Sequence, residues 1–476
     1  MNTILLQPTD VLFFRDGRPM TGSLAGHGAA WPLPNVLNSA FHAALHRGFP
    51  ITGSELNGLQ TRYGDHVHRV VRGKEAVEAE RHRRFGSLQT AGPFPVRVDA
   101  QNCPEKWLLP RPADLQDASL LPALLPASGP WRDSGSLPAP LCYAVANRLP
   151  PAKESGAKSW LSRDALQAYL ETRTFPLDRE AWNDSDLFDA EACLGIGIDP
   201  ETQTQDGERI YSAHYLRLKD AGNWRLGSLV GCAKEEDEKL FQQLLDDEPR
   251  IVVGGQQRLC TARRVSAELT QALPLGRKDF NRCPRAGKFL VKWLLLSPAI
   301  WPIIPDTDAE GSQIKDRDGQ PIRRHEGGWL PNWIDQSSGA VLLKKRLERK
   351  RQGRRLVGQA TDIIAHLVAA VVPKPIVVTG WNLGDPLSSE QDERQAGACS
   401  THLAVPAGAV YYFEAASEPD AQALAHALNW HGALDAPEFG RTIRNRRSTL
   451  MGEKGFGLGV CGTWDFFPNV PGRPVT

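Results

Sequence analysis

Residues 4–47 constrain the fold most, because they predict a strand, a loop and a helix in that order. Two short apolar runs with a polar interruption fill residues 4–14, and turn-forming residues follow at 15–19. Small, glycine-rich residues at 21–28 predict a loop. A proline stop then precedes residues 36–47, where apolar side chains recur at the spacing of a helix.

The turn at 15–19 places Arg15 and Arg18 between a buried strand and the start of a helix. Guanidinium groups and the backbone N–H groups of a glycine-bearing turn suit phosphate oxygens, so the turn is a candidate anion site. An alternative is that Asp16 pairs with one of the arginines and only closes the turn.

Length and charge limit what the chain can be. A chain of 476 residues predicts two domains with sizeable insertions, and its 36 prolines and 43 glycines indicate long irregular connections. The formal charge is only +1. A nucleic-acid partner would therefore be held by local basic patches and not by the whole surface.

The cysteine pattern and the apolar windows favour a cytoplasmic protein without a membrane span. The eight cysteines include no C-x-x-C pair, which fits a reducing compartment, and the N-terminus lacks the pattern of a secretion signal. Lysine and proline residues interrupt the most apolar windows, 289–304 and 366–381, so neither is expected to cross a bilayer.

The elements of a first domain, 1–280, follow the ferredoxin-like order of strand, helix, strand, strand, helix, strand. We expect a large insertion after the first helix, at about 50–190. The remaining elements are a hairpin of strands at 193–198 and 209–218, a helix at 234–246 and a strand at 251–265 containing a bulge-like double glycine.

A second domain, 281–476, begins with an apolar strand at 288–296. Its further elements are a basic insertion at about 306–360, paired strands at 366–372 and 376–381, a strand at 405–413 and a helix at 420–430. The predicted class is α+β: two ferredoxin-like (RRM-like) domains with long insertions and a C-terminal glycine-rich loop.

The basic insertion contains a run of lysines and arginines at 344–355. Such a run is either a solvated face or mobile loop, or a nucleic-acid contact.

The C-terminal segment combines cations with a glycine-rich loop at 452–459. The loop is not a P-loop, because no Gly-Lys-Ser/Thr ends it, and no βαβ unit can follow so near the C-terminus. Cations for phosphate, an approachable backbone and an aromatic ring for stacking favour single-stranded RNA. The candidate RNA-binding residues are Arg15, Arg18, Arg258, Arg444, Arg446, Arg447, Lys454, Gly455, Phe456 and Gly457.

No catalytic or metal-binding set emerges from the sequence. His42 and His46 share a helix face, but Ala43 stands where a metalloprotease helix has Glu, and no third ligand can be placed. Either histidine could still act as a general base in metal-free RNA cleavage. The sequence has no Gly-x-Ser-x-Gly elbow and no cysteine in an electropositive setting.

Several segments resemble one known family. The run PTDVLFFRDGRP at 8–19, followed by WPLP at 31–34, resembles the opening signature of the Cas5-like RAMP subunit of the type III-B CRISPR (Cmr) effector complex. Segments that agree follow in order along the chain: GPF at 92–94, PRPADL at 110–115, GIGID at 195–199 with Tyr211, GG at 254–255, GW at 380–381, VPAG at 405–408 and GFG at 455–457.

The resemblance implies two ferredoxin-like domains, no nuclease activity and no cofactor. It implies that the subunit grips the repeat-derived 5′ tag of the guide RNA. Its partners would be the Cas10-type large subunit and the first copy of the backbone RAMP subunit, and target RNA would be met only indirectly. The chain departs from the family pattern in its longer, more basic insertion at 306–360, which suggests an extra partner, and in Gln256, where Glu is usual.

The RNA tag is expected to lie across the turn at 15–19 and the loop at 452–459. The alternative is that both loops only brace the fold. Two other functions compete with tag binding: a repeat-processing endoribonuclease that uses His42 or His46, and a free-standing RNA-binding module.

Overall fold

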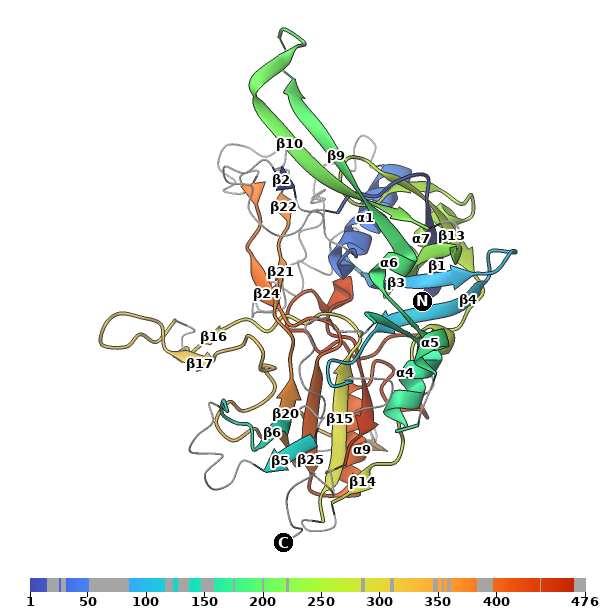
Figure 1. The fold of residues 1–476 in the computed structure, drawn as a ribbon. Coiled ribbons are helices and arrows are strands. Elements are labelled where there is room, and N and C mark those ends of the chain that lie inside the picture. Colours follow the sequence, from blue (N-terminus) through green and yellow to red (C-terminus); the bar gives the residue numbers. More distant parts are fainter. Residues whose placement is uncertain are drawn as a thin grey trace.

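The structure, a computed structural model, describes residues 1–14, 25–26, 31–50, 85–115, 123–126, 137–146, 158–173, 176–198, 201–219, 222–283, 287–308, 312–345, 350–352, 355–357, 361–382, 397–436 and 438–465. Arg15, Arg18 and the predicted turn at 15–19 lie outside these residues. Figure 1 shows two lobes, each built on an antiparallel sheet with helices against it. The predicted α+β class is confirmed.

The first lobe places its central strands in the order β13-β1-β11-β3, all antiparallel. If these four strands are numbered in the order in which they occur along the chain, the sheet has the order 4-1-3-2, which is the strand order of a ferredoxin-like sheet. Phe41 and Phe241 join its two helices, with ring centroids 5.6 Å apart. The elements are β1 (Asn2–Pro8), α1 (Pro34–Gly48), β3 (Leu88–Val98), β11 (Trp224–Cys232), α7 (Glu235–Leu245) and β13 (Leu259–Val265).

The predicted hairpin forms, but it is not part of this sheet. β9 (Phe188–Ile198) pairs with β10 (Gln205–Leu218) in a separate sheet with β2 (Ala25–Gly26), and the hairpin projects from the lobe (Figure 1). The second and third strands of the main sheet are instead β3 and β11. The single insertion predicted at 50–190 is therefore wrong, because β3 lies within it.

Shorter elements extend the first lobe. Ser162 caps one helix, since its Oγ accepts a hydrogen bond of 3.0 Å from the Ala165 backbone N–H. These elements are β12 (Arg250–Val252) at one edge of the sheet, β4 (Pro104–Pro110), β7 (Trp160–Ser162) and β8 (Ala181–Trp182) at the other, α4 (Arg163–Leu170), α5 (Leu177–Glu180), α6 (Asp184–Leu187) and α8 (Leu269–Ala272).

The second lobe repeats the strand order as β26-β15-β25-β20. Within the described residues between β15 and β20, no helix occurs, so this lobe keeps only the second helix of the ferredoxin-like pattern. Its elements are β15 (Phe289–Leu295), β20 (Ala365–Val371), β25 (Val410–Ala415), α9 (Glu418–Leu428) and β26 (Gly459–Thr463), with β14 (Asn281–Arg282) beside β15.

One predicted pairing in this lobe is wrong. The strand after the Pro-Lys-Pro break, β21 (Ile376–Val378), pairs with β24 (His402–Ala404) and not with β20. The remaining short pairs are β5 (Ala123–Pro126) with β6 (Tyr143–Ala146), β16 (Ile304–Pro305) with β17 (Arg323–His325), β18 (Lys350–Gln352) with β19 (Arg355–Val357), and β22 (Trp381–Asn382) with β23 (Gly397–Ala398).

The two lobes share a core. One cluster of buried side chains includes Leu5 and Phe94 from the first sheet and Leu290 and Tyr412 from the second. The boundary near residue 280 therefore stays a prediction, since no gap in packing marks it. None of the helices in the described residues is long and apolar enough to cross a membrane.

A buried polar cluster lies where the lobes meet. Lys292 on β15 is 0% exposed, and its Nζ lies 4.0 Å from Asp114 Oδ2 and 3.7 Å from the centroid of the Tyr169 ring. Asp114, beyond the end of β4, accepts hydrogen bonds of 2.6 Å from the hydroxyls of Tyr169 and Tyr412. Burial lowers the pKa of Lys292 to about 8, against the opposing attraction of Asp114.

Replacing Asp114→Asn should lower the free energy of unfolding by about 3–5 kcal/mol, because the Lys292 ammonium then stays buried without its carboxylate. Urea denaturation measures the change. The double variant Asp114→Asn/Lys292→Met removes both charges and should recover part of the loss. A single variant as stable as wild type would show that the ion pair does not hold the lobes.

The pKa of Lys292 also predicts a pH dependence of stability. Between about pH 8 and pH 10 the unfolded chain binds this proton and the folded chain loses it, so the free energy of unfolding rises by at most about 1.4 kcal/mol per pH unit. Below about pH 8 Lys292 is charged in the folded chain as well, so the burial of its charge lowers the free energy of unfolding by the full amount. The Lys292→Met variant, titrated alongside, should lack the rise, and identical pH profiles for the two proteins would contradict the assignment.

Candidate nucleic-acid interface

The candidate residues from Arg444 to Gly457 lie on one segment, 441–458, which runs between the second lobe and β3 of the first. We call this contact the seam. Arg446 crosses it, because its Nη1 donates a hydrogen bond of 3.2 Å to Gln89 Oε1 on β3. The seam thus brings the C-terminal candidates together.

The glycine-rich loop meets protein backbone. It contains the short 3₁₀ helix η3 (Gly452–Lys454), followed by Gly455 and Gly457 at φ values of 98° and 76°. A Cβ on Gly455 would lie 2.9 Å from the Thr90 carbonyl oxygen, and one on Gly457 would lie 2.0 Å from the Ser448 nitrogen. The close approach that the glycines predict is therefore to β3 and to the loop's own segment.

Phe456, which was predicted to stack on an RNA base, is buried in this conformation. Its side chain is 0% exposed and packs in a small apolar cluster with Ile300, Val378 and Leu450. The packing of Phe456 in this cluster thus explains why an apolar side chain stands between Gly455 and Gly457.

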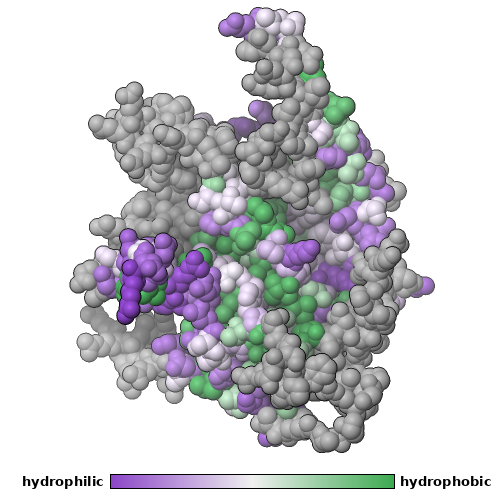
Figure 2. All heavy atoms as spheres, turned by 60° about the vertical axis from the view of Figure 1, so that its left-hand side comes forward, coloured by the Kyte–Doolittle hydropathy of each residue, from purple (hydrophilic) through white to green (hydrophobic). Residues whose placement is uncertain are grey.

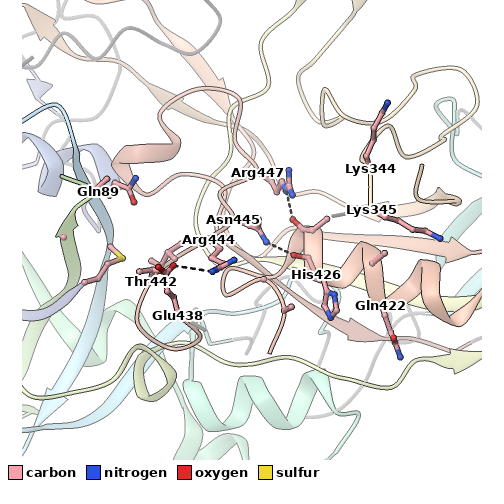
Figure 3. A pocket seen from close by; sticks show the side chains of 18 of the residues that line it. Gln89, Lys344, Lys345, Gln422, His426, Glu438, Thr442, Arg444, Asn445 and Arg447 are labelled. Carbon is pink, nitrogen blue, oxygen red and sulfur yellow. Dashed lines mark hydrogen bonds and ion pairs between the residues drawn. The ribbon is translucent and has the colours of Figure 1, made fainter. Parts of the chain in front are cut away.

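A groove lies along the seam (Figure 3). Its volume is about 1080 Å³, and both lobes line it. α9 supplies Gln422, Ala423, His426 and Ala427, segment 441–447 supplies Thr442, Ile443, Arg444, Asn445 and Arg447, the first lobe supplies Gln89, Gly231, Cys232, Ala233 and Glu238, and Lys344 and Lys345 lie at its rim.

The groove arginines are only partly satisfied by protein groups. Arg444 Nη2 lies 3.3 Å from Glu438 Oε2, whereas its buried Nε has no hydrogen-bond partner among the described residues. Arg447 Nε donates a hydrogen bond of 2.6 Å to the Ala427 carbonyl. Burial lowers the pKa of Arg447 to about 10. Both arginines thus line the groove, each held by one contact to a protein group.

Neighbouring polar groups fix the walls of the groove. Lys345 Nζ lies 2.8 Å from Asp420 Oδ1, and Lys344 is exposed. Asn445 Nδ2 donates to the carbonyls of His426 and Asn429, at 2.8 and 2.7 Å. Burial lowers the pKa of the His426 imidazole, which therefore favours its neutral form. Lys344, Lys345 and His426 were not among the predicted site residues, although the basic run at 344–355 was the signal for the lysines.

Arg258 lies elsewhere. It stacks over Tyr215, with its guanidinium carbon 4.8 Å from the ring centroid, and is 4.0 Å from Asp10. The register of the first sheet puts this end, near Pro8, opposite to the end where Gln89 meets the seam. The adjacent double glycine turns against Phe13, whose carbonyl accepts a hydrogen bond of 2.8 Å from the Gly255 N–H.

The histidines of α1 differ in accessibility. His42 is buried, and burial, followed by the charges of His46 and Lys454, lowers its pKa to about 3. A buried neutral imidazole cannot reach an RNA 2′-hydroxyl without opening the core. His46 is half-buried and packs edge-on against Phe85, with centroids 5.1 Å apart. No group of three or more His, Cys, Asp or Glu in the described residues could hold a metal ion.

Two segments of the family resemblance meet at the junction of the lobes. The Ala113 N–H donates a hydrogen bond of 2.8 Å to the Gly408 carbonyl, and a Cβ on Gly408, at φ 88°, would lie 2.4 Å from the Arg111 carbonyl oxygen. This turn holds the strand end that leads to Asp114. Segments 110–115 and 405–408 therefore position the buried ion pair, a role that the sequence did not indicate.

A family model described as CRISPR-associated protein (Cas_Cmr3) matches residues 4–464, nearly the whole chain. The chain belongs to this family. The resemblance to the Cmr-type RAMP subunit is thereby confirmed at the level of the family. A search of curated proteins found no match.

Solved structures give weaker likenesses. A chain of the cryo-EM structure of the Type III-B Cmr-β complex bound to cognate target RNA and AMPPnP is 12% identical, with 86% of each chain covered and a TM-score of 0.37. A chain of the crystal structure of the Csm1–Csm4 cassette in complex with cA4 is 10% identical, with 85% of this chain and 96% of that chain covered and a TM-score of 0.28. Both scores are too low for an argument.

The close packing within segment 441–458 predicts an unusually high cost for Gly457→Ala. The substitution should lower the free energy of unfolding by roughly 1–3 kcal/mol more than Gly319→Ala. Gly319 has nearly the same φ, 77°, but a Cβ there would meet no atom within 4 Å, so it isolates the backbone strain from the clash. Chemical denaturation of both variants measures the difference, and equal losses would show that close packing within segment 441–458 is not what requires the glycine.

Proposed function

We propose that the chain is a non-catalytic RNA-binding subunit of a cytoplasmic type III-B Cmr effector complex. In this role it binds the repeat-derived 5′ tag of the guide RNA and bridges the Cas10-type large subunit to the backbone RAMP subunit. It meets target RNA only through the guide. The observation that carries the proposal is the family match over residues 4–464.

The seam supports RNA as the ligand. Arg444, Arg446 and Arg447 lie on one segment beside an open groove, with Lys344 at its rim. Guanidinium and ammonium groups clustered on a chain of formal charge +1 form the kind of local basic patch that binds phosphates.

Exposed apolar surface supports the proposal that the chain is part of a larger complex. Large apolar side chains are exposed, such as Leu194 at 82% and Leu403 at 57%. Figure 2 shows apolar residues gathered in the middle of one face. An apolar hollow of about 700 Å³ lies between β6, the segment after β20 and β24, lined by Leu141, Tyr143, Trp329, Val372 and Leu403 among others. Apolar surface of this kind is typical of subunit contacts.

The rival function is repeat-RNA cleavage with a histidine base. The burial of His42 leaves His46 as the more accessible of the two residues. Cleavage would also need groups that position the 2′-hydroxyl and the leaving oxygen.

Purified chain should bind a guide RNA carrying the repeat-derived 5′ tag and leave repeat RNA uncut in the absence of metal. Scrambling the tag should weaken binding by about tenfold or more, because one lost base contact costs roughly 1–3 kcal/mol. Fluorescence anisotropy and denaturing gels give the two readouts. Specific cleavage that His46→Ala abolishes, and that the exposed control His366→Ala leaves intact, would replace this proposal with the nuclease.

A further inference from the structure

We propose that the seam groove holds the sugar–phosphate backbone of single-stranded RNA, independently of base sequence. The inference rests on the proposed function, which makes RNA the ligand. It adds a second mode of contact to tag recognition: the tag bases specify the guide, and the groove binds a stretch of its backbone.

Arg447 is the first argument. Its guanidinium is mostly buried, and no carboxylate of the described residues lies within ion-pair distance of it. A buried charge without a counter-charge costs free energy unless an ion supplies one. The groove beside Arg447 is open, so an anion can enter and offset that cost.

Arg444 and Lys344 provide a second, independent argument. The buried Nε of Arg444 has no acceptor among the described residues. The carboxylate that pairs with Arg444, Glu438, is 63% exposed. Lys344 projects at the rim (Figure 3). The Arg444 side chain is 19% exposed, so the outer nitrogens of its guanidinium, and not the buried Nε, are the donors that a phosphate oxygen can reach.

The remaining lining selects the backbone of RNA over its bases. No Phe, Tyr or Trp lines the groove among the described residues, so His426 is the only ring of the described lining on which a base could stack. Gln89 and Gln422 offer uncharged polar groups of the kind that contact ribose and phosphate oxygens.

The two acids of the lining do not close the groove to an anion. One carboxylate, Glu238, is occupied: it accepts hydrogen bonds from the Cys232 N–H at 2.7 Å and from Asn2 Nδ2 at 2.8 Å. The other, Glu438, is 63% exposed, so water screens its charge, and it is paired with Arg444 at 3.3 Å.

The test uses the full chain and two synthetic single-stranded RNAs, one with the repeat-derived 5′ tag and one with that tag scrambled. Binding of wild type, Lys344→Ala, Arg444→Gln and the control Lys374→Ala is measured by anisotropy over a range of salt concentrations. Lys374 is an exposed lysine outside the groove. Thermal unfolding of each variant checks that it is folded.

The two groove variants should weaken binding of both RNAs by the same factor, about threefold for Lys344→Ala and about tenfold for Arg444→Gln at low salt. Each should reduce the slope of log affinity against log salt by about 0.7, the value for one phosphate contact with a single strand. The ratio between tagged and scrambled RNA should not change, and Lys374→Ala should behave as wild type.

Other outcomes overturn the inference in distinguishable ways. Unchanged affinity and slope in folded groove variants would remove the groove while leaving tag binding intact. Wild type that does not distinguish the two RNAs, although both groove variants weaken it, would refute tag recognition and keep the groove. Groove variants that lose a co-expressed partner subunit, with RNA binding unaltered, would make the groove a protein contact.

Discussion

One buried ion pair, between Lys292 and Asp114, lies where the two lobes share their apolar core. The ammonium comes from the central strand of the second sheet and the carboxylate from the end of a strand of the first, and two tyrosines complete the site. Because charges removed from water tolerate little change in distance, such a pair fixes orientation more than it adds stability.

The seam joins the same two lobes. Segment 441–458 passes close to β3, where glycine at 455 permits the approach, while glycine at 457 permits the segment to pack against its own backbone at Arg447 and Ser448. The same path carries Arg444 and Arg447 into a groove that neither lobe forms alone, since α9 gives one wall and the ends of β3 and β11 give the other. Structure and candidate function therefore depend on the same contact.

Sequence patterns predicted where helices and strands lie better than they predicted which strands pair in a sheet. The first helix, the strand at 288–296 and the helix at 420–430 follow from apolar spacing, which is a local property. Sheet membership is not local: β9 and β10 look like central strands, while β11 is interrupted by Gly227, where a Cβ would lie 2.3 Å from Val96. The burial of Phe456 could not be predicted either, because the sequence of a loop alone does not distinguish a ring that binds a ligand from one that is buried. Lys292, a single charge inside an apolar run, was the clearest unused signal of a buried partner.

The projecting hairpin carries the lobe's core face out into solvent. Side chains alternate along β9, so Leu194 and Ile196 continue the face on which Phe188 is buried at the base. β9 is also an edge strand of its sheet among the described residues, so its backbone can accept another strand. An apolar edge of this kind invites self-association at high concentration. The isolated chain is therefore expected to be less soluble than the chain with a partner that covers the hairpin. Its solubility depends on what is expressed with it.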